Sequence, residues 1–114
     1  MTILEIYEKV SLRVPLEQRR FFNYFNDSVR EIESLYSSFG DHVFEEGTEF
    51  KPAKSLEDEI NILPLYHEAI VDNVIFLAGG DASYKAEFAR KAEAAWLKYW
   101  NKNAKYRINK RARL

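Results

Sequence analysis

The chain contains no cysteine among its 114 residues. This absence excludes a disulfide, a thiolate metal site and a cysteine nucleophile, and we expect the protein to work in a reducing compartment. Long apolar runs are also missing, because the longest uncharged apolar stretch, from Asn73 to Gly80, is far short of the roughly 20 residues of a bilayer span. The first residues show no basic segment followed by an apolar run, so no signal peptide is predicted. We therefore expect the protein to be cytosolic when it is synthesised and not to bind a membrane.

Signatures of catalysis are missing as well. No Ser or Thr lies in a motif typical of a nucleophile beside a base. The pair Gly79-Gly80 lacks the Lys-Ser/Thr of a phosphate-binding loop and follows a predicted helix instead of opening one. We predict no enzyme activity and no cofactor.

The two histidines, His42 and His67, lie far apart in the sequence. His67, Glu68 and Asp72 share one helical face, because residues four apart are neighbours on a helix. A metal site needs more ligands with oriented partners. We therefore predict a solvated polar face here and no metal site.

The net charge of −1 conceals a strong asymmetry. Six of the 17 basic residues and none of the 18 acidic residues follow Asn101, so the body carries a charge of −7 and the tail one of +6. A broad basic face for nucleic acid is therefore not predicted. We divide the chain into a helical domain over residues 1–101 and a basic C-terminal arm over residues 102–114.

Apolar periodicity predicts an all-α domain, a bundle of about four helices. Thr2 and Glu5 form a capping box for the first helix, and Pro15 ends that helix or begins the next. The second helix ends near Gly40. The predicted buried stripes of these two helices are Ile3, Tyr7, Val10 and Val14, then Phe22, Phe25, Val29, Ile32 and Tyr36, widened by Phe21 and Leu35.

Two further helices are predicted in the second half of the chain. Pro64 suits the first position of the third helix, and Gly79-Gly80 suits its end. That helix is apolar on several sides, which is typical of a central helix or one shared with another subunit. Asp81 is a candidate N-cap for the fourth helix. The predicted faces are Tyr66, Ile70, Val74 and Leu77, then Tyr84, Phe88, Ala92, Ala95 and Tyr99 with Trp96 and Trp100 beside them.

Residues 41–54 between the second and third helices fit either a small hairpin or a plain surface loop. A hairpin there would need support from the helices or from a neighbouring chain. Ser55 and Asp58 resemble a capping box for a short helical turn. The aromatic content of 15% fits a core of large side chains or an additional contact surface. Candidate contacts with another subunit are Val43, Phe44, Phe50 and Lys51.

The tail allows three interpretations: an arm that binds a partner protein, a disordered solubilising terminus, and a nucleic-acid tether. An arm would use both charge and apolar anchors. Its candidate residues are Lys102, Lys105, Tyr106, Arg107, Ile108, Lys110, Arg111, Arg113 and Leu114.

The chain resembles the head–tail connector (adaptor, or head-completion) proteins of tailed bacteriophages, over nearly its whole length. The resemblance rests on the run from Phe21-Phe22-Asn23-Tyr24 to Ile32. It continues through Leu65-Tyr66, Ala69-Ile70, the run Asp72 to Leu77, Tyr84, Glu87-Phe88, Ala92-Glu93 and Trp96. A helix pair, an inserted loop or hairpin, a second helix pair and a C-terminal extension are the usual order of that family.

The resemblance implies a structural virion protein of the phage neck. Copies would contact one another sideways in a ring, a dodecamer by the resemblance, beneath the portal protein. The basic arm would bind the portal, and a stopper or other neck protein would follow on the tail side. DNA would only pass through a channel whose acidic wall repels phosphate. The alternative is a small helical nucleic-acid-binding or regulatory protein that uses its basic tail.

Overall fold

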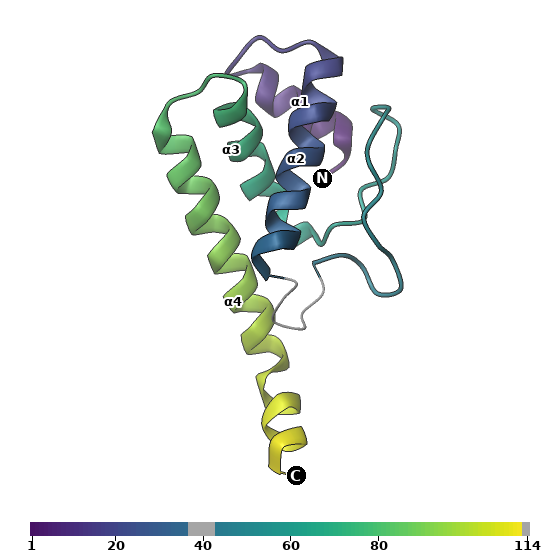
Figure 1. Cartoon of the computed structure of the whole chain (residues 1–114), viewed down its shortest axis with the longest axis vertical. Coiled ribbons are helices and arrows are strands. Elements are labelled where there is room, and N and C mark those ends of the chain that lie inside the picture. The colour runs from purple at the N-terminus through teal and green to yellow at the C-terminus, as the bar shows by residue number, and fades with distance from the viewer. Residues whose placement is uncertain (37–42, 113–114) are drawn as a thin grey trace.

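The computed structural model describes the backbone of residues 1–36 and 43–112, and side chains up to residue 99. Four α-helices carry the fold: α1 (Ile3–Ser11), α2 (Gln18–Tyr36), α3 (His67–Leu77) and α4 (Ala82–Ala112). A 3₁₀ turn, η2 (Pro64–Tyr66), leads into α3. Within the described ranges there is no strand, only one isolated antiparallel bridge. The predicted all-α architecture is therefore confirmed (Figure 1).

Helix α1 begins as its capping box predicts. The Thr2 side chain accepts a hydrogen bond from the Glu5 backbone N–H at 3.1 Å, and the Glu5 carboxylate accepts one from the Thr2 backbone. The buried face is Ile3, Ile6 and Val10. Tyr7 was predicted on this face but is only half-buried, because its hydroxyl reaches out to donate to the Leu16 carbonyl at 2.9 Å.

Helix α2 presents a face slightly rotated from the predicted one. Its buried residues are Phe21, Phe25, Ser28, Val29 and Ile32. Phe22 is half-buried and Leu35 is 46% exposed. The rotation follows from packing, because Phe21 meets Tyr7 edge-on with ring centroids 5.0 Å apart, an arrangement that aromatic pairs favour.

Helix α3 is the central helix, as its apolar character predicted. Eight of its eleven residues are buried, and it contacts α1, α2 and α4. Pro64 lies in the 3₁₀ turn that precedes the helix and not at its first position. Three of the buried residues of α3 are polar, namely His67, Asp72 and Asn73, and each therefore needs a partner.

The turn between α3 and α4 closes in a Schellman motif, and Gly79 adopts a φ of +113° that favours glycine. The Gly79 N–H donates to the Phe76 carbonyl at 3.1 Å, and the Gly80 N–H donates to the Ile75 carbonyl at 2.8 Å. A Cβ on Gly80 would lie 2.8 Å from the Ile75 side chain. Asp81 caps α4 as predicted, because its carboxylate accepts the Ser83 N–H at 2.8 Å.

Helix α4 is 31 residues long, and its C-terminal part projects beyond the rest of the chain (Figure 1). Its buried residues Phe88, Ala92 and Ala95 pack on the body. The sequence pattern fades near Asn101, but the backbone stays helical to Ala112. As far as Ala112 the backbone of the predicted arm thus continues α4, and the division at residue 101 into a domain and an arm stays a prediction.

Candidate interaction surfaces

Residues 43–63, here called the 43–63 loop, form a closed loop and not the hairpin that was one of the two predictions. Phe44 and Ile62 make the isolated bridge at its base. The Glu45 N–H donates to the Asn61 carbonyl, and the Leu63 N–H donates to the Val43 carbonyl, both at 2.8 Å. These bonds join the two ends of the loop, while the residues between them follow an irregular path.

The 43–63 loop is fixed to helix α2 by one amide. The Asn26 side chain donates to the Ala53 carbonyl at 3.1 Å and accepts from the Ala53 N–H at 2.7 Å. One turn later, the guanidinium of Arg30 lies 4.8 Å from the centre of the Phe50 ring, within reach of a cation–π contact. The loop is therefore an ordered part of the body.

Inside the loop, Asp58 closes a turn with Ser55. Its carboxylate accepts the backbone N–H groups of Lys54 and Ser55 at 2.8 and 2.9 Å. These two bonds hold the pKa of Asp58 below its usual range, because they favour the charged carboxylate. The predicted capping residues thus pair, but they stabilise a turn and open no helix.

The four candidate inter-subunit residues divide into two groups. Val43 and Phe44 are 2% and 7% exposed and belong to the core of this chain. Phe50 is half-buried and Lys51 is exposed. Only the second pair therefore offers surface to another molecule.

His67 and Asp72 are not on a solvated face, and this prediction is corrected. His67 is 5% exposed. Its Nε2–H donates to the Ile62 carbonyl at 3.0 Å, and its Nδ1 accepts from the Met1 ammonium at 3.0 Å. Burial lowers the pKa of His67, since the low-dielectric interior disfavours the charged ring. His67 is thus a neutral linker between the N-terminus and the base of the 43–63 loop.

Asp72 and Glu68 each pair with a lysine of another helix. Lys91 Nζ of α4 lies 2.6 Å from Asp72 Oδ2, and Lys9 Nζ of α1 lies 2.9 Å from Glu68 Oε1. Among the described residues no group of three or more His, Cys, Asp or Glu side chains is placed to hold a metal ion. His42 lies outside the described residues.

A polar network between α2, α3 and α4 was not predicted. Asn73, fully buried on α3, donates to Ser28 Oγ at 2.9 Å and to Glu31 Oε2 at 3.2 Å. Lys85 of α4 donates to Asn73 Oδ1 at 3.0 Å and to Glu31 Oε1 at 2.5 Å. Its ammonium also lies 4.6 Å from the centre of the Phe88 ring. The only sequence signal was a polar residue inside the apolar stripe of α3.

Three aromatic rings join α2, η2 and α4. Tyr36 stacks on Tyr66 with centroids 6.1 Å apart and on Trp96 with centroids 5.6 Å apart. Burial raises the pKa of Tyr66 to about 12, with smaller contributions from Tyr36 and Tyr99. These rings fix α4 against the end of α2, at the level where α4 begins to leave the body. Here the aromatic residues serve the core.

An open groove of about 530 Å³ lies between the start of α1 and the 43–63 loop. We call it the acidic groove. Its apolar residues are Met1, Leu4, Leu56 and Ile60. Its acidic residues are Glu45, Glu57, Asp58 and Glu59. Leu4 is 44% exposed in it.

The opposite end of α1 carries a second surface, here called the Leu12 edge, which consists of Lys9, Leu12 and Arg13. Leu12 is 85% exposed. The edge borders a second hollow, which is lined further along by Val71, Ile75 and Tyr84 and by the lysine-paired carboxylates of Glu68 and Asp72. No residue lines both this hollow and the acidic groove. Neither surface was predicted from the sequence, because periodicity does not reveal which apolar residues stay uncovered.

The predicted arm residues, Lys102, Lys105, Tyr106, Arg107, Ile108, Lys110, Arg111, Arg113 and Leu114, have side chains outside the described part of the structure. Their assignment to a partner stays a prediction. In the part of the chain that is described, no helix has the length and apolarity needed to cross a bilayer. No protein-family model, curated protein or solved structure matches the chain.

Proposed function

We propose that this chain is a structural protein of the tailed-phage neck, where copies of it form a ring under the portal and connect the head to the tail. The observation that carries the proposal is helix α4, which extends for 31 residues to Ala112 and projects from the body (Figure 1). The projecting end coincides with a sequence of six basic and no acidic residues. A long charged helix that leaves its own body is suited to bind a larger partner.

The remaining features support an assembly role over catalysis. The polar side chains inside the body pair with one another, as Asn73, Lys85 and Glu31 do. Such satisfied networks rigidify a core. In the proposal, the body acts as a rigid acidic wall along the DNA channel, and the end of α4 binds the portal.

Removal of residues 102–114 tests the portal contact. We expect the truncated chain to keep its thermal unfolding transition and to bind the portal protein of the same genome at least about tenfold more weakly. A second variant keeps the length and replaces the six tail cations by Gln. The matched control is Arg19→Gln/Lys98→Gln, which removes two exposed cations of the body. Unchanged portal binding by both tail variants would refute the assignment.

The same cations favour a second candidate function, in which the tail binds nucleic acid. Six phosphate contacts would give a plot of log affinity against log salt with a slope of about −5. A slope of that size for duplex DNA that disappears in the Gln variant would support this candidate. Portal binding without DNA affinity would support the neck protein.

A further inference from the structure

Leu12 is an unusual residue for the surface of a small domain. At 85% it is the most exposed of the large exposed apolar side chains in the described part of the chain, where Leu4, Leu35, Leu65 and Leu97 range from 38% to 46%. It follows the last residue of α1 and is its C-cap. Arg13 beside it is exposed, and its side chain forms no ion pair or hydrogen bond with the described residues.

The acidic groove is the chemical complement of this edge. Leu4, Leu56 and Ile60 provide apolar surface at a position that is open to another molecule. Asp58 is occupied by the backbone of its own turn. The carboxylates of Glu45, Glu57 and Glu59 are exposed and form no ion pair with described residues. Three free carboxylates around an apolar hollow suit an apolar side chain flanked by cations.

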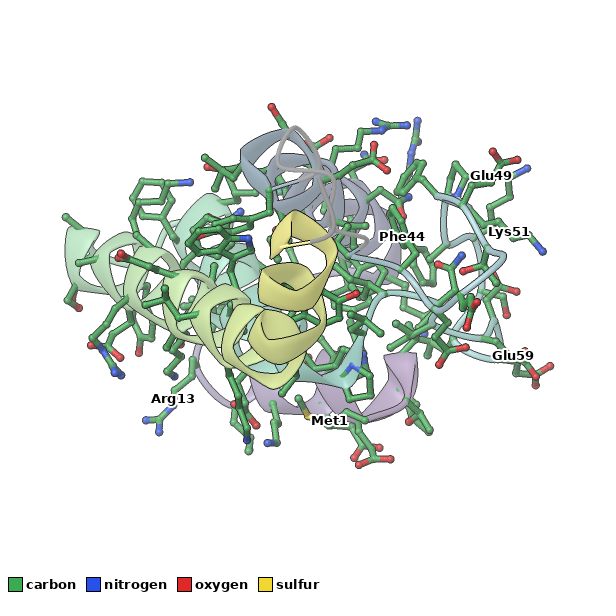
Figure 2. The ribbon with its side chains drawn as sticks, turned by 90° about the horizontal axis from the view of Figure 1, so that it is seen from below. Met1, Arg13, Phe44, Glu49, Lys51 and Glu59 are labelled. Atoms are coloured by element: carbon green, nitrogen blue, oxygen red, sulfur yellow. The ribbon has the colours of Figure 1, made fainter. Side chains whose placement is uncertain are left out.

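The two surfaces lie on opposite sides of the molecule. Figure 2 shows Arg13 at one side and Glu59 at the other, with Met1 between them. In Figure 1 the 43–63 loop runs along one flank of the body, whereas the turn after α1 crosses its top end. A chain cannot fill its own groove with its own Leu12 edge in this arrangement, but a second copy can.

We propose that the acidic groove receives the Leu12 edge of a second copy of this chain. Leu12 enters the space between Leu4, Leu56 and Ile60, while Arg13 faces Glu57 and Glu59. The contact joins two different surfaces, so each copy keeps one groove and one edge for further copies, and a closing rotation makes a ring. The ring beneath a portal rests on the proposed function, whereas the pairing of the two surfaces does not.

Charge exchange tests the contact on the full chain by sedimentation equilibrium. We expect the unmodified chain to self-associate with a dissociation constant below about 1 mM. The association should be weaker in about 0.5 M NaCl than in about 0.05 M NaCl, because salt screens the charges. Arg13→Glu and Glu59→Lys should each raise the dissociation constant about tenfold or more. The double variant Arg13→Glu/Glu59→Lys should return to within about threefold of the unmodified chain, because opposite charges meet again.

Leu12→Ser tests the apolar part and should also weaken self-association about tenfold, with Leu97→Ser as its matched control. Lys98→Glu and Glu93→Lys are the matched controls for charge reversal, because both residues are exposed on α4. A chain that stays monomeric at about 1 mM, or a double variant without rescue, would overturn the proposal.

The two proposals fail separately. A chain that stays monomeric at about 1 mM but binds the portal protein would reject the self-contact and leave the neck function standing. Normal self-association together with absent portal binding would support the contact and reject the neck function.

Discussion

The amide of Asn26 forms two hydrogen bonds with the backbone of Ala53, one as donor and one as acceptor. It pairs with the 43–63 loop as a neighbouring strand would, although 27 residues separate the partners. Ala53 is 6% exposed, so its N–H and carbonyl have little access to water. A single side chain therefore satisfies a buried segment of backbone.

Asn26→Ala is expected to lower the free energy of unfolding by about 1–3 kcal/mol, because it leaves two buried backbone groups without partners. Urea unfolding measures this loss, and limited proteolysis should cut the 43–63 loop faster. Asn23→Ala, on an exposed position of the same helix, is the control and should change stability by less than about 0.5 kcal/mol. Equal stabilities of the two variants would contradict the anchoring role of Asn26.

Asn73→Ala is expected to cost about 2 kcal/mol or more, because Asn73 is fully buried and joins three helices. Lys85→Met should cost less, about 1 kcal/mol at most, since the side chains of Lys85 and Glu31 are each 37% exposed and water can replace their pairing. Chemical unfolding of both variants gives the comparison. A larger loss for Lys85→Met would show that the ion pair, and not the buried amide, dominates the network.

Gly80→Ala is expected to destabilise the fold by about 1–3 kcal/mol, since the new Cβ would meet the Ile75 side chain and carbonyl at 2.8 and 2.9 Å. Gly47→Ala is a useful comparison, because Gly47 has a φ of +77° but open space around it. It should cost only the conformational strain of about 1–2 kcal/mol. Thermal unfolding compares the two, and unchanged stability in Gly80→Ala would contradict the close α3–α4 turn.

His67 is expected to make stability depend on pH below neutrality. Its pKa is lowered in the folded chain by burial, so between that lowered pKa and about 6.5 the unfolded chain binds more protons. The contribution of His67 to the free energy of unfolding should therefore be fully present above about pH 6.5 and should decrease as the pH drops below that value. The Met1 ammonium, Glu45 and Glu68 also act on this ring.

Urea unfolding between about pH 5 and pH 7 tests this in a His42→Gln background, where His67 is the only histidine. His67→Gln should remove most of the dependence of the free energy of unfolding on pH, while the glutamine amide keeps part of the hydrogen bonding. A slope that persists in the double variant would assign the pH dependence to another group.

Local features of this fold were predictable from the sequence, and long-range features were not. The capping box of Thr2 and Glu5, the Asp81 cap and the Gly79-Gly80 helix end each depend on residues a few positions apart, and the structure confirms all three. The contact between Asn26 and Ala53 depends on how distant segments pack, and no pattern in the sequence encodes it.

The candidate surfaces show the same limit. Periodicity placed His67 and Asp72 on a polar face, but tertiary packing covered that face with the N-terminus and with Lys91 of α4. Leu12 lies just after the last turn of α1, where the pattern has no preferred side, so its exposure appears only in the folded chain. The charge asymmetry of the tail, in contrast, was read directly from the sequence.

The bonds that join Val43 to Leu63 and Glu45 to Asn61 have a consequence for how this chain can vary. Because the loop is tied at its base, added residues near Gly47 would change the reach of the loop without moving the helices. The entropic cost of lengthening a closed loop grows only with the logarithm of its length, about 0.6 kcal/mol per doubling. The loop should therefore tolerate inserted residues near Gly47, such as an engineered tag, while the helices keep their arrangement.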